Sequence, residues 1–222
     1  MPTAFISHPD CMLYQMQSWH PESPARPIAI KNQLTVSSLM QHLVLFDALL
    51  VTREQLLRVH MEQHLALIEA TAPTEGIMNL DMDTAMCPHS LNAAHRAAGA
   101  AVLAVNLVIN KKMRNAFCSV RPPGHHAMRK RAMGFCLFNS IAAGMAHALE
   151  QHGLECIAIV DFDVHHDDEL AGMNLLEADY AWVTEQIKRV ADEYAEDRIV
   201  SSLEGGYDLP ALGRSVAAHL QV

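Results

Sequence analysis

Apolar positions along the chain follow two patterns, one with helical spacing and one nearly continuous over four to six residues. Helical spacing, together with capping and stop signals, predicts helices over about 53–71, 89–109, 139–151, 177–195 and 210–220. Ser90 is the expected cap of the second of these helices, Gly153 ends the third, and Pro210 lies in the first turn of the last. Residues 20–27 are rich in proline, and no periodicity extends to residue 32, so we expect a loop there.

The nearly continuous apolar runs predict strands at residues 3–7, 116–120, 156–160 and 198–203. Strands that are apolar on both faces are typical of a parallel sheet covered by helices on either side. Their alternation with helices predicts an α/β fold. We find no linker, repeat or low-complexity tract and therefore expect residues 1–222 to form a single domain.

Composition excludes several classes of protein. The 222 residues are 50% apolar and 18% charged, which excludes an intrinsically disordered chain, and the net charge of -9 argues against nucleic-acid binding through a broad basic face. An acidic body still suits a cationic substrate such as an amine. Five cysteines without a CxxC motif indicate reduced thiols and a cytoplasmic location. We expect no secretory signal and no membrane span, and the sequence leaves the oligomeric state open.

Polar motifs follow three of the predicted strands: RPPGHH at 121–126, DFDVHH at 161–166 and EGGYD at 204–208. In open parallel sheets, ligands bind beyond the carboxyl ends of the strands, so we expect the three motifs to meet at one edge. Each motif alone is also compatible with an ordinary turn or loop.

The middle motif carries the most specific chemistry. With the two-residue period of a strand, Asp161, Asp163 and His165 point to one side, while Phe162 points to the other. Burying carboxylates beside an imidazole is costly unless a cation compensates them. Oxygen and nitrogen donors suit catalytic zinc better than a structural thiolate site, although a polar strand end exposed to water is the alternative.

Zinc, two adjacent histidines and a tyrosine can together hydrolyse an amide without a covalent intermediate. The metal polarises a carbonyl and acidifies a bound water, and a histidine moves the water's proton to the leaving amine. A tyrosine hydroxyl donates a hydrogen bond to the developing oxyanion. The absence of a GxSxG motif gives nucleophilic catalysis little support.

Six motifs, in order along almost the whole chain, resemble the histone deacetylase family, in particular its class II and bacterial acetylpolyamine amidohydrolase-like members. They are HPESPAR (20–26), LDMDT (80–84), RPPGHHA (121–127), MGFCLFN (133–139), IVDFDVHH (159–166) and LEGGYDL (203–209). The resemblance implies a parallel sheet flanked by helices, of the arginase–deacetylase type. It also implies zinc-dependent hydrolysis of acetyl-lysine or another acetylated amine.

The resemblance also implies roles for single residues. Asp163 and His165 are the implied zinc ligands, and His125 and His126 the tandem catalytic histidines, with His126 as the proton shuttle. Asp161 is implied to orient His125 and to contact a structural monovalent cation. Tyr207 is the implied carbonyl-polarising residue, while Gly134 and Phe135 are implied to line the substrate channel.

The sequence departs from the family pattern after about residue 166. Family members carry further strands there, followed by a second motif that supplies a third ligand, an aspartate. Here the first motif runs directly into DDELAG at 167–172, so some strands are expected to be missing. Asp167 and Asp168 are candidates for the third ligand, or they form a solvated acidic turn. The alternative functions are an inactive deletion form, acting as a binding or oligomerisation module, and a metal-free hydrolase.

Overall fold

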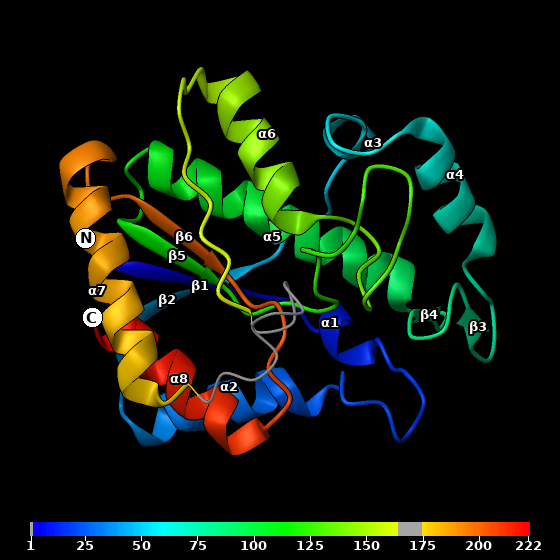
Figure 1. Ribbon diagram of the computed structural model, residues 1–222, viewed down its shortest axis with the longest axis horizontal. Helices are drawn as coiled ribbons and strands as arrows, with labels where there is room; N and C mark the ends of the chain where they lie inside the picture. The colour runs from blue at the N-terminus through cyan, green and yellow to red at the C-terminus, as the bar shows by residue number, and fades with distance from the viewer. Residues whose placement is uncertain (1, 164–174) are drawn as a thin grey trace.

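The computed structural model describes residues 2–163 and 175–222 and consists of a parallel sheet between two layers of helices (Figure 1). The sheet has the order β2-β1-β5-β6, and every neighbouring pair in it is parallel. Its strands are β1 (Thr3–Ser7), β2 (Leu43–Asp47), β5 (Asn115–Cys118) and β6 (Ile199–Ser202). A small antiparallel pair is formed by β3 (Met78–Asn79) and β4 (Ala85–Met86). The predicted α/β fold with a parallel sheet is confirmed.

Among the helices of the described residues, α5 and α7 are the longest. They are α1 (Asp10–Leu13), α2 (Ala25–Val36), α3 (Arg53–Leu57), α4 (Glu62–Thr71), α5 (Ser90–Ile109), α6 (Ser140–His152), α7 (Glu177–Tyr194) and α8 (Leu209–Gln221), with a 3-10 turn at η1 (Met40–His42). The predicted end of α6 at Gly153 and the predicted place of Pro210 in the first turn of α8 are confirmed.

Side chains alternate between the two faces of the sheet and so build two cores. Ala4 and Ile6 of β1 face α5, whereas Phe5 between them packs with Phe117 of β5 against α2 and α8, the two phenyl rings lying 6.0 Å apart. On the other side of the molecule from α2 and α8, α6 packs on α5 (Figure 1). The alanine-rich face of α5 allows both the sheet and α6 to approach closely.

By length and apolar composition, α5 could cross a membrane, but 67% of the relevant window is buried inside the fold. Such burial is expected of the central helix of a globular core. Ser90 is not the cap of this helix, as the sequence had suggested, because its hydroxyl accepts a hydrogen bond from the Cys87 backbone (2.8 Å) and His89 takes the cap position.

Two elements of the structure differ from those predicted, because tertiary contacts override the local sequence pattern. The single helix expected over 53–71 is two helices, because the Met61 backbone N–H donates to the Arg129 carbonyl (2.9 Å) and draws the chain off the helical path. The loop expected from residue 20 to residue 32 is confirmed only as far as Pro24, because α2 begins at Ala25. Pro24 stands at its N-cap and Pro27 in its first turns, where a missing N–H leaves no helical hydrogen bond unmade.

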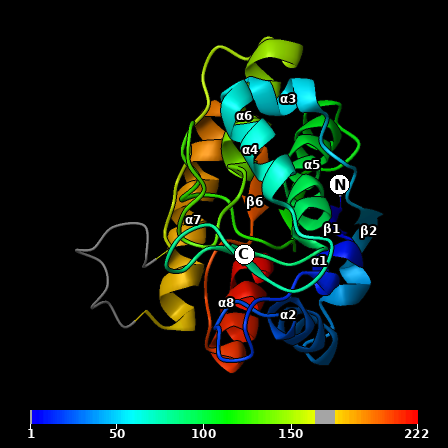
Figure 2. The same ribbon diagram turned by 90° about the vertical axis from the view of Figure 1, so that its right-hand side faces the viewer.

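The strand predicted over 156–160 is wrong. Residues 154–163 belong to no described strand, and Ile157, Ile159 and Val160 are 37%, 51% and 55% exposed. Figures 1 and 2 show this segment passing β6 on the side away from β5. Within the described ranges, β6 pairs with β5 alone, so the segment makes no strand pairing with β6 that would complete its backbone hydrogen bonds.

Candidate active site

The ends of β5 and β6 and the segment after Val160 nevertheless meet at one edge, as expected. Asp161 Oδ2 lies 2.8 Å from His125 Nδ1, and the rings of His125 and His126 lie 4.1 Å apart. Asp163 Oδ2 accepts a hydrogen bond from the Gly205 backbone (2.6 Å). The two carboxylates therefore face the motifs at 121–126 and 204–208, and the expected gathering of these side chains does not require residues 156–160 to be a strand.

Phe162 points away from the two aspartates. Its ring lies 6.0 Å from Tyr180 of α7 and 6.3 Å from His219 of α8. The two-residue alternation predicted for this segment therefore holds for its described part, from Asp161 to Asp163. The phenyl ring anchors the segment to the helical layer, while the carboxylates remain at the site.

His125 has an unusual electrostatic environment. Burial by itself lowers the pKa of this imidazole, but the hydrogen bond to Asp161 and the charges of Glu204 and Asp163 reverse the effect, so that the pKa lies above its ordinary value. The protonated, doubly donating form of His125 is therefore stabilised, and the ring is held by Asp161 in a fixed orientation.

Gly134 and Phe135 form a tight turn against the histidines and Tyr207. Gly134 has a φ of +56°, and a Cβ built there would lie 2.5 Å from the His126 ring. Phe135 also has a positive φ, +68°, which is strained for a side chain of this size. Its ring makes edge contacts with His20 (4.4 Å) and Tyr207 (5.9 Å). The turn therefore places the ring of Phe135 beside the phenol of Tyr207.

Tyr207 is held near this turn by a buried arginine. Arg26 donates from Nε to the Gly206 carbonyl (2.8 Å), and its guanidinium lies 4.9 Å from the centre of the Tyr207 ring. The same guanidinium also donates to the Glu204 and Gly205 carbonyls. Burial raises the pKa of Tyr207 well above its usual range, so the phenol stays neutral and keeps its proton for donation.

Glu22 links Arg26 to Arg121 beneath the site. Its carboxylate accepts from Arg26 Nη1 (2.8 Å) and from Arg121 Nε (2.9 Å) and Nη2, and none of the three side chains has measurable exposure. Arg121 also donates to the Cys11 and Tyr14 carbonyls. The network ties the start of the 121–126 motif to the 204–208 motif.

The predicted zinc donors are only partly within the described residues. Asp163 lies at the site, whereas His165, Asp167 and Asp168 lie outside the described residues. A carboxylate oxygen and an imidazole nitrogen are donors that zinc accepts, so the position of Asp163 fits a ligand role. A catalytic zinc needs three protein ligands, and the described ranges place one of those expected.

A second donor group, which the sequence did not suggest, lies beside the first. His125, Cys136 and Glu204 each offer a ligand atom within 4.8 Å of the others. Burial raises the pKa of both the Cys136 thiol and the Glu204 carboxyl, which opposes the deprotonated forms that a metal requires. Glu204 Oε2 instead accepts from the backbone N–H groups of Gly124 (2.6 Å) and His125 (3.1 Å). Glu204 therefore supports residues 121–127, which we call the histidine loop.

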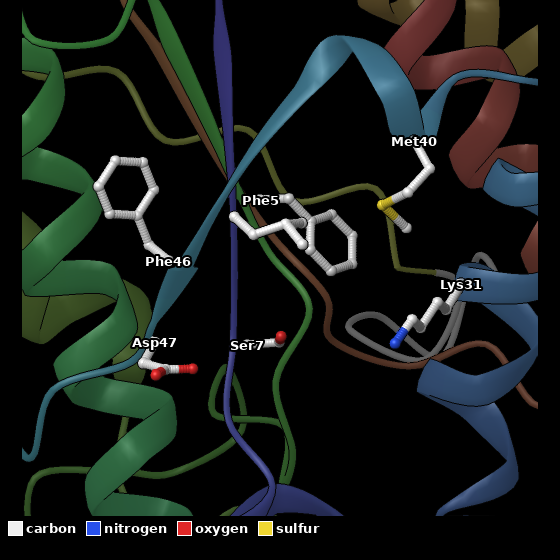
Figure 3. Close-up of a pocket in the computed structure, with 7 residues that line it drawn as sticks. Phe5, Ser7, Lys31, Met40, Phe46 and Asp47 are labelled. Atoms are coloured by element: carbon white, nitrogen blue, oxygen red, sulfur yellow. The ribbon is translucent and has the colours of Figure 1, made fainter.

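A separate pocket of about 280 Å³ lies beside β1 and β2 (Figure 3). Lys31 reaches toward it from α2, Ser7 from β1 and Asp47 from β2, and the remaining lining is apolar. No residue of the predicted site lines it. The pocket is therefore not part of the candidate active site.

Comparison with known proteins agrees with the motifs and the geometry. The family model described as "Histone deacetylase domain" matches residues 20–168 and 166–222, so nearly the whole chain is covered in two parts that meet at 166–168. The chain belongs to the histone deacetylase family. The junction of the two matched parts coincides with the point where the sequence joins two family motifs.

Individual relatives are similar over most of this chain. A histone deacetylase-like amidohydrolase of Pseudomonas aeruginosa is 39% identical over 147 residues, which are 66% of this chain and 38% of the relative. A probable deacetylase of Archaeoglobus fulgidus is 34% identical over 170 residues (76% and 46%), and the mouse polyamine deacetylase HDAC10 is 33% identical over 175 residues (75% and 26%). The chain thus spans less than half the length of each of these relatives.

A crystal structure of the HDA15 HD domain superposes on the fold with a TM-score of 0.86. At 21% identity, it covers 99% of this chain and 88% of the solved one. This similarity confirms the predicted arginase–deacetylase type of fold.

Proposed function

We propose that this chain hydrolyses the acyl amide of an acetylated amine by the chemistry of its family. The observation that carries the proposal is the contact between Asp161 and His125 (2.8 Å) beside the ring of His126. Two adjacent imidazoles, one of them paired with a carboxylate, can take a proton from water and deliver it to a leaving amine.

In this proposal, His126 is the general base and then the general acid. Its ring lies against Gly134, where the lack of a side chain leaves room for it. His125, whose protonated form the contact with Asp161 favours, donates hydrogen bonds and positive charge toward the attacking water and the oxyanion. The two rings differ in their surroundings, since His125 contacts Asp161 and the ring of His126 lies against Gly134.

Tyr207 supplies a neutral phenol opposite the histidines. Its raised pKa keeps the hydroxyl proton in place, and Arg26 fixes the backbone on which the residue stands. A hydrogen bond that strengthens as the carbonyl oxygen becomes an oxyanion lowers the barrier without tightening substrate binding.

The proposed zinc ligands are Asp163 and His165, with Asp167 or Asp168 as the third. Bound there, the metal would polarise the substrate carbonyl and lower the pKa of a water molecule. The monovalent cation implied for Asp161 is a further part of this proposal, and it has no separate role in the proton transfers.

The proposed substrate is an acetylated amine, either acetyl-lysine or an acetylated polyamine. The matching family model is described as a histone deacetylase domain, and one relative is named a polyamine deacetylase. The net charge of -9 favours a substrate that carries positive charge beyond the acetyl group.

The test combines metal content with turnover. The purified chain is analysed for zinc and then assayed for acetate release from an acetyl-lysine reporter and an acetylated diamine, with and without added zinc. We expect His126→Ala to abolish turnover with zinc still bound, and Tyr207→Phe to lower kcat on the order of 100-fold with little change in KM. The exposed His42 provides a control, since His42→Ala removes an imidazole far from the motifs.

Less than stoichiometric zinc together with no acetate release would contradict the proposal and favour the inactive binding module. Turnover that survives a strong chelator would instead favour a metal-free hydrolase. Equal losses in kcat and substrate affinity for Tyr207→Phe would contradict the role given to the phenol.

A further inference from the structure

A histidine outside the family motifs joins the end of the segment that carries the tandem histidines to the start of α6. His60 lies between α3 and α4, is 3% exposed, and uses both ring nitrogens. Nδ1 lies 3.0 Å from the Met128 carbonyl, and Nε2 accepts a hydrogen bond from the Asn139 backbone N–H (2.9 Å). One ring therefore joins the residue that follows the histidine loop to the residue that precedes α6.

Only one form of the imidazole satisfies both contacts. The Asn139 N–H needs an unprotonated Nε2, and the Met128 carbonyl needs a proton on Nδ1, so the ring is neutral with its proton on Nδ1. Burial, assisted by the neighbouring His64, lowers the pKa of His60 to about 4, which agrees with this form.

The side chain of Asn139 in turn bonds to the histidine loop. Its side-chain Oδ1 caps α6 by accepting from the Ala142 backbone (2.9 Å), and Nδ2 donates to the carbonyls of His125 (3.4 Å) and Ala127 (3.3 Å). The two parts also touch directly, because a Cβ at Gly124 would lie 2.8 Å from the Phe138 carbonyl oxygen. The histidine loop therefore rests on the residues that His60 holds.

We propose that His60 is a positioning residue of the hydrolysis reaction, fixing the place of His125 and His126 through Met128 and Asn139. This inference rests on the proposed function, since it assigns the residue a part in that reaction. His60 touches neither of the reacting imidazoles and acts only through the backbone and Asn139.

Two histidines near His60 make different contacts. His64 donates from Nε2 to the Leu137 carbonyl (2.9 Å), but its buried Nδ1 has no partner among the described residues. His95 packs edge-on against Phe138 in the same cluster, and its ring contacts the Val51 carbonyl (3.2 Å) rather than the histidine loop. His60 is the member of this group that bridges the two segments.

The test uses two substitutions at His60, one at Asn139 and a control. His60→Leu removes both contacts, whereas His60→Gln can still accept from the Asn139 N–H. Asn139→Asp keeps the cap of α6 and loses the donor to His125 and Ala127. His95→Leu is the matched control, because it removes an imidazole from the same cluster without touching the histidine loop.

We expect His60→Leu and Asn139→Asp each to lower kcat on the order of 100-fold with KM within about twofold, as displaced catalytic groups do. His60→Gln recovers most of the loss, and His95→Leu retains the wild-type kcat. Equal losses for the Leu and Gln variants would overturn the proposal, because they would reduce His60 to a packing role.

A second readout does not depend on turnover. In protein labelled with 15N-histidine, the Nδ1 resonance of His125, which reports its contact with Asp161, is expected to shift or broaden in His60→Leu and Asn139→Asp but not in His95→Leu. If the wild type releases no acetate, the proposed function fails while this measurement still tests the positioning. A folded His60→Leu variant with a wild-type His125 resonance would overturn it. If that variant does not fold, Asn139→Asp decides, and a wild-type resonance there overturns it equally.

Discussion

The buried carboxylate of Glu22 offers a sharp test of how the base of the site is stabilised. Glu22→Gln keeps the size of the side chain and removes its charge. The substitution replaces one carboxylate oxygen by an amide nitrogen that itself donates. The guanidiniums of Arg26 and Arg121 then share the one remaining acceptor oxygen of residue 22. None of the three side chains is exposed to solvent.

The magnitude follows from that lack of solvent. Glu22 accepts three hydrogen bonds, from Arg26 Nη1 and from two nitrogens of Arg121. Breaking a buried ion pair by removing one partner typically costs about 3–5 kcal/mol, because the remaining charge stays buried. In a chain of this size, 1 kcal/mol corresponds to roughly 2–4 °C in Tm, so we expect Tm to fall by roughly 10 °C.

Urea unfolding followed by far-UV circular dichroism measures the effect as a lower midpoint at an unchanged slope. An exposed ion pair gives the matched control. Arg53 and Glu62 pair at side-chain exposures of 40% and 63%, and Glu62→Gln should change the free energy of unfolding by less than about 1 kcal/mol. A Glu22→Gln variant as stable as this control would refute the reasoning, since water would then have to reach both guanidiniums.

Two further predictions concern the turn beside His126 and a half-buried histidine on α8. Gly134→Ala should lower kcat on the order of 100-fold by displacing the His126 ring, while Gly153→Ala, at a similar positive φ with nothing within 4 Å, costs stability alone and controls for backbone strain. Similar kinetics for the two variants would contradict this. Burial lowers the pKa of His219 to about 4. Between about pH 4 and 6.5 the unfolded chain then binds the extra proton, so stability falls as pH falls, by about 2 kcal/mol at pH 5. Urea unfolding at pH 7 and 5 should show a smaller pH dependence in His219→Phe, and an equal dependence would be evidence against this role.

Local sequence signals predicted those elements whose ends are set by the chain itself. Gly153 ends α6 with a left-handed φ of +65°, and Pro210 stands in the first turn of α8, where proline is tolerated. Strands β1, β5 and β6 were predicted because each is apolar on both faces and each has a neighbour in the sheet.

Elements that depend on distant partners could not be predicted in the same way. The run at 156–160 has the composition of a buried strand, yet a strand exists only where another strand completes its hydrogen bonds. The break between α3 and α4 depends on the Arg129 carbonyl, 68 residues beyond Met61, which no window of local periodicity contains. The strength of a local pattern therefore does not guarantee the structure that it favours.

The same distinction applies to the site. Motifs at the ends of the predicted strands led to His125, Asp161 and Tyr207, which the structure gathers at one edge. Glu204 stands in one of those motifs, but its hydrogen bonds to the histidine loop depend on the pairing of β5 with β6. His60 falls within the helix predicted over 53–71, and nothing near it in the sequence indicates its contact with Asn139.

Within the described residues, β6 pairs with β5 alone, and this has a practical consequence for handling the protein. Backbone groups on an unpaired strand edge can bond to those of another molecule, and the uncharged, exposed stretch 156–160 beside β6 adds apolar surface that favours association. Precipitation at high concentration should therefore begin here. Ile159→Lys, which puts a charge on a side chain already half in solvent, should raise the concentration at which the protein stays dispersed without disturbing its core.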